Sequence, residues 1–265
     1  MQQQPIGPAA PPGRTSRALV TGATAGLGLA FARALAGRGH RLVLVARDAE
    51  RLQAVAGELM HRWHVDATVL VADLSTEDGT ARVAAVLADD SVPVDVLVNS
   101  AGFGQRLPFG DNDVSAEQRS LDVHVRAPLL LCHAVLPGMR ARGHGVIVNV
   151  SSIAGWLPRG TYGAHKAWLT SFTRWLDIAY RLEGVRAMAV CPGLVHTEFH
   201  QRMGVDMAGV PRWMWLDADS VVSEALRDLA AGVRVSVPSR RYRLLMRLAA
   251  VVPDGWVAGV ARRGR

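Results

Sequence analysis

The sequence predicts a single α/β domain, a Rossmann-type doubly wound parallel sheet of about seven strands. Two observations predict this fold class. From Arg17 onward, short apolar runs rich in β-branched residues alternate with stretches of helical periodicity. A glycine cluster directly follows the first of these runs. Alternating strands and helices form a parallel sheet covered on both faces, and right-handed crossovers place the ligand crevice at the carboxyl ends of its strands.

The expected elements follow one another without an internal boundary or a repeat. We expect strands at 18–21, 42–46, 68–72, 94–99, 145–150, 186–191 and 233–237. We expect helices near 27–37, 48–62, 76–89, 114–141, 161–183 and 218–231. Residues 1–16, rich in Gln, Pro and Gly, are expected to form a disordered leader before the domain at 17–238. The irregular segment at 194–216 is interpreted as a substrate lid, with a packed surface excursion as the alternative.

Composition and charge exclude several classes of protein. The chain has 265 residues, 49% of them hydrophobic, which suits one globular domain. No apolar run approaches the ~20 residues that are needed to span a bilayer. The net charge of +7 comes largely from the tails, since residues 239–265 hold seven arginines against Asp254 alone. The nearly neutral body therefore shows no nucleic-acid footprint. Cys132 and Cys191 lie in apolar stretches, which indicates packed thiols in a reduced, cytoplasmic protein.

The turn after the first strand has the features of a dinucleotide-binding loop. It reads TGATAGLG and runs into a helix. Glycines let the backbone turn tightly and approach a pyrophosphate closely, and the free N–H groups of the following helix face the phosphates. A glycine-rich turn without a ligand is the alternative, but the strand before the turn and the helix after it favour the cofactor. The residues expected to contact it here are Thr21, Gly22, Thr24, Gly26, Leu27 and Gly28.

The ends of the second and third strands indicate which dinucleotide binds. An NAD site is expected to carry a carboxylate for the ribose hydroxyls near the end of the second strand, where this chain has Ala46 and then Arg47. Arg47 can pair with a 2′-phosphate, which predicts NADP(H), although Asp48 lies next to it. Asp73, followed by Leu74, is placed where a carboxylate could accept from the adenine amino group; a helix N-cap is the alternative.

A tyrosine and a lysine one helical turn apart predict the reaction. Tyr162 and Lys166 share one face of a helix, and Ser152 follows the fifth strand. An ammonium and the positive ring of an oxidised nicotinamide lower the pKa of a phenol, which can then exchange a proton with an alkoxide. Ser152 can hydrogen-bond the same oxygen. Strand alternation lets only one of Ser151 and Ser152 face the site, and Ser152 is chosen by its place before Ile-Ala-Gly. Lys166 can also hold the nicotinamide ribose. It is the one lysine among 30 basic residues, which favours a need for a compact ammonium.

In their order along the chain, the segments TGATAGLG, ADLS, NSAG, SS, YGAHK and CPG resemble those of the short-chain dehydrogenase/reductase family, over roughly residues 15–237. The resemblance implies an NADP-preferring oxidoreductase that interconverts a carbonyl and a hydroxyl by hydride transfer, with Ser152, Tyr162 and Lys166 as catalytic residues. It implies dimers or tetramers formed through the fourth and fifth helices, and no metal. It also implies cofactor contacts by Asn99, Ala101, Gly102, Tyr162, Lys166, Pro192, Gly193, Val195 and Thr197.

His124 departs from the family pattern. Most members carry a catalytic Asn at the matching position, which supports a water in a proton relay to the lysine. Pro128 has no N–H, so the carbonyl of His124 is expected to be free to bind such a water. Alternatively the imidazole itself relays the proton, since it titrates near neutrality, or it takes no part in turnover. We include His124 among the expected catalytic residues.

The side chains expected around the carbonyl are apolar, which suits an apolar small-molecule substrate. A 3-oxoacyl-thioester reductase acting on carrier-bound chains and a non-catalytic NADP-binding module are the alternatives. Residues 239–265 predict a basic amphipathic helix that packs on the protein or a partner subunit, covers the active site, or makes weak contact with an anionic membrane; we favour packing. The expected lining comprises Phe103, Leu107, Phe109, Trp156, Leu157, Leu194, Phe199, Met203, Trp213, Met214 and Trp215.

Overall fold

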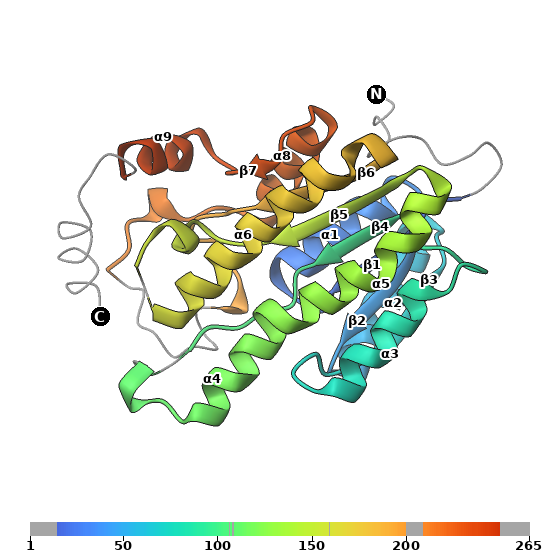
Figure 1. Ribbon diagram of the computed structural model, residues 1–265, viewed down its shortest axis with the longest axis horizontal. Coiled ribbons are helices and arrows are strands. Elements are labelled where there is room, and N and C mark those ends of the chain that lie inside the picture. The colour runs from blue at the N-terminus through green and yellow to red at the C-terminus, as the bar shows by residue number, and fades with distance from the viewer. Residues whose placement is uncertain (1–14, 106, 108, 159, 200–208, 250–265) are drawn as a thin grey trace.

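The structure is a computed structural model that describes residues 15–105, 107, 109–158, 160–199 and 209–249. The described residues form a seven-stranded sheet in the order β3-β2-β1-β4-β5-β6-β7, and every neighbouring pair is parallel. The predicted fold class is therefore confirmed (Figure 1). From the edge strand β3 the chain returns to β4, which pairs with the other side of β1, so the strand order reverses between β1 and β4. Doubly wound sheets bind their ligands at this switch point. The expected leader lies outside the described residues, apart from its last two.

The strands are short runs of β-branched and aliphatic residues, as predicted. The central strands β4 and β5 are buried along their whole length, because helices cover both faces of the sheet there. The edge strand β3 is only partly buried. The strands are β1 (Arg17–Thr21), β2 (Arg41–Ala46), β3 (Ala67–Val71), β4 (Val96–Asn99), β5 (Gly145–Val150), β6 (Val185–Val190) and β7 (Val235–Ser236).

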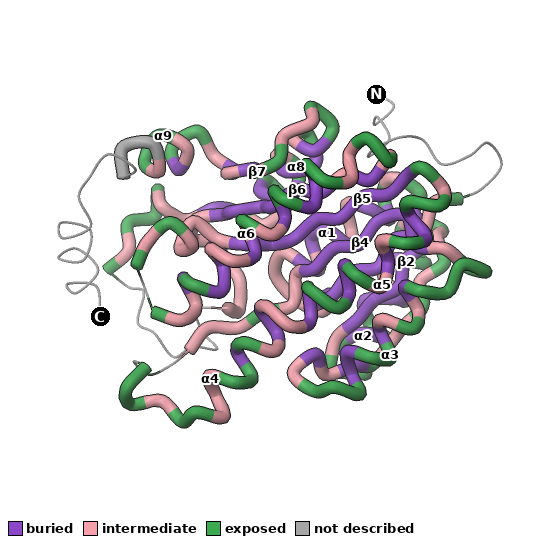
Figure 2. Tube along the Cα trace, viewed as in Figure 1, coloured by how far each residue is buried: buried purple, intermediate pink, exposed green. Residues whose placement is uncertain are grey.

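Two layers of helices enclose the sheet, and each buries its own hydrophobic core against it. One core contains Phe31 and Leu52, and the other contains Leu131 and Met139. Figure 2 shows the buried strands between helices whose outer faces are exposed. The first layer consists of α1 (Gly26–Ala36), α2 (Ala49–Trp63) and α8 (Ala218–Ala230), and the second of α3 (Glu77–Ala88), α5 (Ala127–Arg142) and α6 (Gly160–Tyr180).

A π-helical turn at Asp122–Arg126 divides the helix expected at 114–141 into α4 (Val114–Leu121) and α5. The N–H of Ala127 bonds to the carbonyl of Asp122, five residues back instead of four. Pro128 lacks the N–H that an α-helix would direct at the carbonyl of His124. Widened turns of this kind gather at functional sites. Here the turn places His124 in the protein interior, with 1% of the residue exposed.

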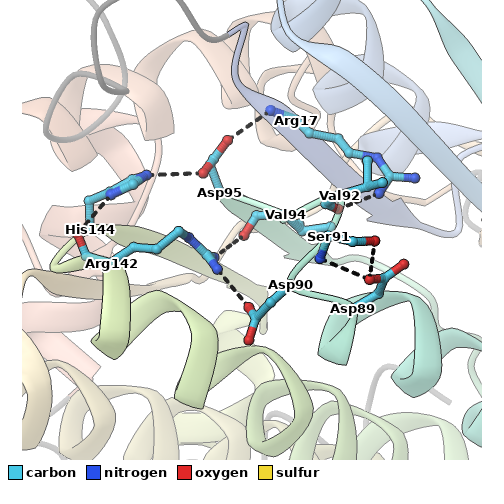
Figure 3. A network of polar contacts seen from close by, with 9 residues as sticks. All are labelled: Arg17, Asp89, Asp90, Ser91, Val92, Val94, Asp95, Arg142 and His144. Carbon is cyan, nitrogen blue, oxygen red and sulfur yellow. Dashed lines mark hydrogen bonds and ion pairs between the residues drawn. The ribbon is translucent and has the colours of Figure 1, made fainter.

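Buried polar contacts fix the far end of α6 and the amino ends of the strands. Asp177 is fully buried, pairs with Arg181 and Arg234 at 2.7 Å each, and accepts the N–H of Ala187 in β6 at 3.1 Å. In the middle of the sheet, before β1, β4 and β5 begin their pairing, Asp95 accepts from the backbone of Arg17 at 3.0 Å and from His144 at 3.1 Å (Figure 3). These contacts hold the sheet rigid at the end opposite its ligand crevice.

Between β6 and α8 the described residues form no strand of the sheet, and a short 3-10 helix lies at Arg212–Met214. Residues 200–208 lie outside the described residues, and Val195 bridges Leu216 where the segment returns. The expected C-terminal helix is present as α9 (Arg240–Ala249), and the chain beyond it is not described. In the described ranges, no helix is both long and apolar enough to cross a membrane.

Candidate active site

The turn between β1 and α1 leaves room for a ligand phosphate against its backbone. Gly22 has φ +68°, and a Cβ on it would lie 2.9 Å from the Cα of Ala101. A Cβ on Gly28 would lie only 2.1 Å from the carbonyl oxygen of Gly22, so both positions require glycine. No side chain caps α1 at Ala25, and its first turn holds no acidic residue. The N–H groups at the start of α1 are thus available to an anion, whereas side chains cap α2 and α3.

Two of the expected cofactor residues direct their side chains into the protein. The Thr21 hydroxyl accepts the N–H groups of Ser100 and Ala101 at 3.0 and 3.1 Å. Asn99 is 4% exposed and donates to Asn149 at 2.8 Å. These bonds align the carboxyl ends of β1, β4 and β5. We call the region at the carboxyl ends of β1, β4 and β5 the groove. Thr21 and Asn99 therefore shape it through the backbone that they hold in place.

The residue after β2 is an exposed cation. Arg47 is 70% exposed in its side chain, and its Nη1 lies 3.9 Å from Oδ2 of Asp73. Asp48, the next residue along the chain, caps α2 by accepting the N–H of Arg51 at 3.0 Å. Asp73 caps no helix; its Oδ1 accepts the N–H and hydroxyl of Ser75, at 2.9 and 2.8 Å. This leaves Oδ2 of Asp73 facing Arg47, while the neighbouring Leu74 is buried.

The two serines after β5 point in different directions. Ser151 is buried and bonds to the carbonyl of Lys166 and the hydroxyl of Thr170, both at 2.8 Å. It therefore anchors α6 to the sheet. Ser152 lies on the other side, where its hydroxyl accepts the N–H of Ala154 at 3.1 Å and hydrogen-bonds Tyr162. The structure thus brings Ser152, and not Ser151, to the tyrosine.

Helix α6 carries Tyr162 and Lys166 side by side. The ammonium of Lys166 lies 5.6 Å from the centre of the Tyr162 ring and donates to the carbonyl of Val150 at 2.9 Å. Burial raises the pKa of the Tyr162 phenol to about 12, and the hydrogen bond with Ser152 opposes this rise. Burial lowers the pKa of Lys166 from 10.5 to about 8. The phenol thus keeps its proton at neutral pH, beside an ammonium that can stabilise the phenolate once that proton has left.

His124 packs directly against this group. Its ring meets Tyr162 edge-on at 5.3 Å between centroids, and a Cβ on Gly102 would lie 2.7 Å from its Cε1. Nε2 lies 2.7 Å from the carbonyl oxygen of Phe103, which fixes the proton on Nε2. Nδ1 is buried and has no partner in the described part of the chain. Burial, and then the charge of Lys166, holds the pKa of His124 well below 6.5, so the imidazole stays neutral.

The segment after β6 closes the groove from the opposite side. The carbonyl of Pro192 accepts the N–H of Ile153, next to Ser152, at 3.1 Å. Thr197 packs on the glycine loop, since a Cβ on Gly26 would lie 3.1 Å from its Cγ2. Val195, within the segment, is buried. The 192–197 stretch thus lies between the glycine loop and Ser152.

Aromatic side chains border the tyrosine. The ring of Phe199 lies 5.9 Å from Tyr162, and that of Phe103 lies 5.6 Å from His124. Trp215 stacks on His196 at 4.6 Å. Of the other expected lining residues, Met203 lies outside the described residues. Four further residues of the expected lining have substantially exposed side chains: Leu107, Phe109, Trp156 and Trp213.

Sequence reasoning missed two residues that act on this segment. Arg51, in the first turn of α2, bonds Glu198 through Nη1 at 3.0 Å and so joins the segment to the far side of the groove. Tyr242, in α9, bonds the backbone of Leu194 and Met214. Neither position belongs to a local motif, because the bonded residues are 147, 48 and 28 positions apart. No cluster of three or more His, Cys, Asp or Glu side chains able to hold a metal occurs in the described ranges.

Comparison with known proteins agrees with this geometry. The family model for short chain dehydrogenase matches residues 16–207. A very-long-chain 3-oxoacyl-CoA reductase from Anas platyrhynchos is 36% identical over 195 residues, which are 71% of this chain and 62% of the relative. The chain thus matches less than two thirds of that relative's length.

Two solved structures are similar over nearly the whole fold. A short-chain dehydrogenase from Sphingobium yanoikuyae in complex with NADPH has a TM-score of 0.81 and 31% identity, covering 90% of this chain and 96% of its own. A bulky-bulky ketone specific alcohol dehydrogenase from Comamonas testosteroni has a TM-score of 0.76 and 29% identity, covering 90% and 95%.

Proposed function

The chain belongs to the short-chain dehydrogenase family of oxidoreductases, which act on alcohol and carbonyl groups, and on this premise we propose that it is an NADPH-dependent reductase of apolar ketones or aldehydes. One observation carries the proposal: a phenol that retains its proton, Tyr162, lies beside Ser152 and Lys166 at the mouth of the groove. The glycine loop and the uncapped start of α1 fit a dinucleotide that ends at this tyrosine.

The chemistry of reduction divides between the cofactor and the chain. Bound NADPH supplies the hydride that adds to the carbonyl carbon. Ser152 and Tyr162 hold the carbonyl oxygen, and Tyr162 donates its proton to that oxygen as the C–O double bond becomes single. The alcohol is released, and Lys166 stabilises the phenolate that remains until solvent returns a proton. Oxidation of an alcohol follows the same path in reverse.

Arg47 supports the preference for NADPH, because it is exposed and the carboxylate next to it is used to cap α2. We expect Arg47→Ala to raise the KM for NADPH about tenfold, since a charge-assisted bond to the 2′-phosphate is lost. The KM for NADH, which has no such phosphate, should stay within about twofold. Initial rates with both nucleotides measure this, and Arg82→Ala on the outer face of α3 is the matched control. An equal rise for both nucleotides would contradict a contact with the 2′-phosphate.

The apolar side chains around Tyr162 support a bulky apolar substrate, and one structural neighbour is named for bulky ketones. Consumption of NADPH and NADH with a panel of apolar ketones and aldehydes tests the proposed function directly. We expect turnover with NADPH that exceeds turnover with NADH. Binding of NADPH without its consumption across the panel would instead favour the non-catalytic module.

A second candidate is reduction of 3-oxoacyl thioesters, favoured by the relative named as a 3-oxoacyl-CoA reductase and by the basic C-terminal residues. An acidic carrier protein would complement those arginines. Kinetics with carrier-bound and CoA-bound 3-oxoacyl chains separate the two substrates. To test the tail, the chain is best shortened after residue 249. Removal of all of 239–265 would also remove Tyr242 and its bonds to Leu194 and Met214.

His124 tests how the proton is resupplied. Because its imidazole is held neutral, we propose that its part in the relay runs through its backbone in the π-helical turn. We therefore expect His124→Asn, which keeps an N–H donor for Phe103, to retain turnover within about threefold. His124→Ala, which also leaves a cavity, provides the comparison for packing. A collapse of kcat in His124→Asn with unchanged NADPH binding would show that the imidazole has a task of its own.

A homo-oligomer is proposed from the outer faces of α5 and α6. Leu129 and Leu130 on α5 are exposed, as are Trp175 and Ile178 on α6, and Leu182 just beyond it is 99% exposed. An apolar surface of this kind marks an interaction site, and sedimentation equilibrium measures the resulting mass. The two described cysteines are free and buried, which supports the proposed reduced, cytoplasmic setting.

A further inference from the structure

Helix α9 directs one aromatic side chain into the protein beneath the active-site segment. Tyr242 is 4% exposed, although Arg240, Arg241 and Leu244 around it are exposed. It belongs to a small hydrophobic cluster with Val195 and other residues from the two ends of the 194–216 segment and from α8. This cluster is distinct from the two main cores. Tyr242 is therefore buried against the segment that closes the groove rather than against the sheet.

The phenol of Tyr242 joins the beginning and the end of that segment. Its hydroxyl donates to the carbonyl of Met214 at 2.7 Å and accepts the N–H of Leu194 at 3.2 Å. The segment ends also bond to each other, since the N–H of Leu216 donates to the carbonyl of Leu194 at 2.8 Å. A single hydroxyl thus satisfies the backbone N–H of Leu194 at the start of the segment and the backbone carbonyl of Met214 near its end.

The ring of Tyr242 packs on the residue that precedes Leu194. A Cβ on Gly193 would lie 2.1 Å from Cζ of the ring, so the ring fills the space of a side chain there. Gly193 follows Pro192, whose carbonyl binds the loop next to Ser152. The ring thus contacts Gly193, the residue after Pro192, while its hydroxyl bonds the backbone of Leu194 and Met214.

The rest of α9 is anchored independently of this contact. Arg243 pairs with Glu224 of α8, and the N–H of Ser239 donates to the same carboxylate at 3.0 Å. Arg241 donates to the carbonyl of Trp213, next to Met214, at 2.6 Å and so also contacts the segment. Because the two bonds to Glu224 hold the helix, loss of the Tyr242 hydroxyl should loosen the backbone at Leu194 without releasing α9.

We propose that Tyr242 is a positioning residue, which holds the backbone at Gly193–Leu194 and at Met214 and so sets the affinity for NADPH and for the carbonyl substrate. The inference rests on the proposed function. Tyr242 is expected to affect ligand binding rather than the chemical step. It contacts the backbone of Gly193, Leu194 and Met214, and no hydrogen bond or ring contact with Tyr162 occurs in the described residues. Removal of Tyr242 should raise KM for both ligands and leave kcat nearly unchanged.

The variant Tyr242→Phe removes the hydroxyl and keeps the ring. We expect the KM for the carbonyl substrate and the Kd for NADPH, followed by nucleotide fluorescence, each to rise about tenfold. Hydrogen exchange of the peptide that contains Leu194 should accelerate in the apo protein, because its N–H loses an acceptor. Tyr180→Phe, the same chemical change at the far end of α6, is the matched control and should alter none of these quantities.

A double-mutant cycle tests the ring itself. Gly193→Ala should weaken NADPH binding because its methyl collides with the ring, and it should weaken binding less in a Tyr242→Ala background, where that space is empty. Additive losses would overturn the ring contact.

If Tyr242→Phe leaves the hydrogen exchange of the Leu194 peptide and the affinity for NADPH unchanged, the proposal is wrong. It is also wrong if kcat and the melting temperature fall while KM stays constant, because that result indicates a merely structural role. If the wild type binds NADPH but reduces no carbonyl, the proposed function fails, while exchange and nucleotide affinity still decide the role of Tyr242.

Discussion

Replacement of Tyr162 by Phe is expected to reduce turnover with NADPH by a factor between about 10² and 10⁴, the usual contribution of a positioned acid or base. The phenol is the donor whose proton is retained at neutral pH, because burial raises its pKa to about 12. Phe keeps the ring that packs against His124 and Phe199, so the groove should keep its shape. Only the proton and the hydrogen bond to the carbonyl oxygen are lost.

Two measurements separate this expectation from a loss of folding or of cofactor. Fluorescence titration should give the same Kd for NADPH in Tyr162→Phe as in the wild type, within about threefold. Tyr180→Phe changes the same group on the same helix, about 27 Å away by the helical rise, and should retain full turnover. Turnover that survives in Tyr162→Phe would show that another group donates the proton and that the catalytic assignment is wrong.

Much of this arrangement follows from patterns that act locally. The seven strands lie within a few residues of their predicted positions, because buried parallel strands are recorded as short apolar runs. The glycine loop was predictable because both its need for φ > 0 and its close backbone contacts select glycine. Alternation along β5 predicted that only one of the two serines faces the site, and Ser152 was chosen by its place before Ile-Ala-Gly. The structure brings Ser152 to Tyr162 and turns Ser151 to α6.

Other features depend on contacts that no local pattern records. The expected helix at 114–141 is interrupted by a π-helical turn, in which the N–H of Ala127 bonds to the carbonyl of Asp122 just before Pro128. The basic C-terminal segment gave no sign of a role for Tyr242, which bonds Leu194, 48 positions earlier. Thr21 and Asn99 were expected to face the cofactor, yet their side chains are used to align neighbouring strands.

Lys166 is expected to control how the reduction depends on pH. Burial lowers its pKa from 10.5 to about 8, so the ammonium is charged below pH 8 and neutral above it. Only the charged form stabilises the phenolate that appears as Tyr162 donates its proton. We therefore expect kcat/KM for reduction to fall as the pH rises through about 8. Tyr162 itself, with a pKa of about 12, remains protonated through this range.

The neighbouring groups should not produce this step. The pKa values of His124 and His165 are lowered below 6.5, chiefly by burial, and burial raises that of the Cys191 thiol to about 11. Lys166→Met should therefore abolish the step and reduce kcat/KM by about 10² or more, since the stabilising charge is absent at every pH. Lys166→Arg should restore little, because Lys166 is 4% exposed and its site holds a compact ammonium rather than a planar fork.

The stability of the wild type should change in the opposite direction over the adjoining range. Between pH 8 and 10.5 the unfolded chain holds the Lys166 proton and the folded chain does not, so the contribution of Lys166 to the free energy of unfolding rises with pH. The same titration that lowers the activity thus stabilises the fold. Thermal melts across this range, compared between wild type and Lys166→Met, measure the difference. A wild-type activity that falls near pH 8 without this gain in stability relative to Lys166→Met would assign the activity step to another group.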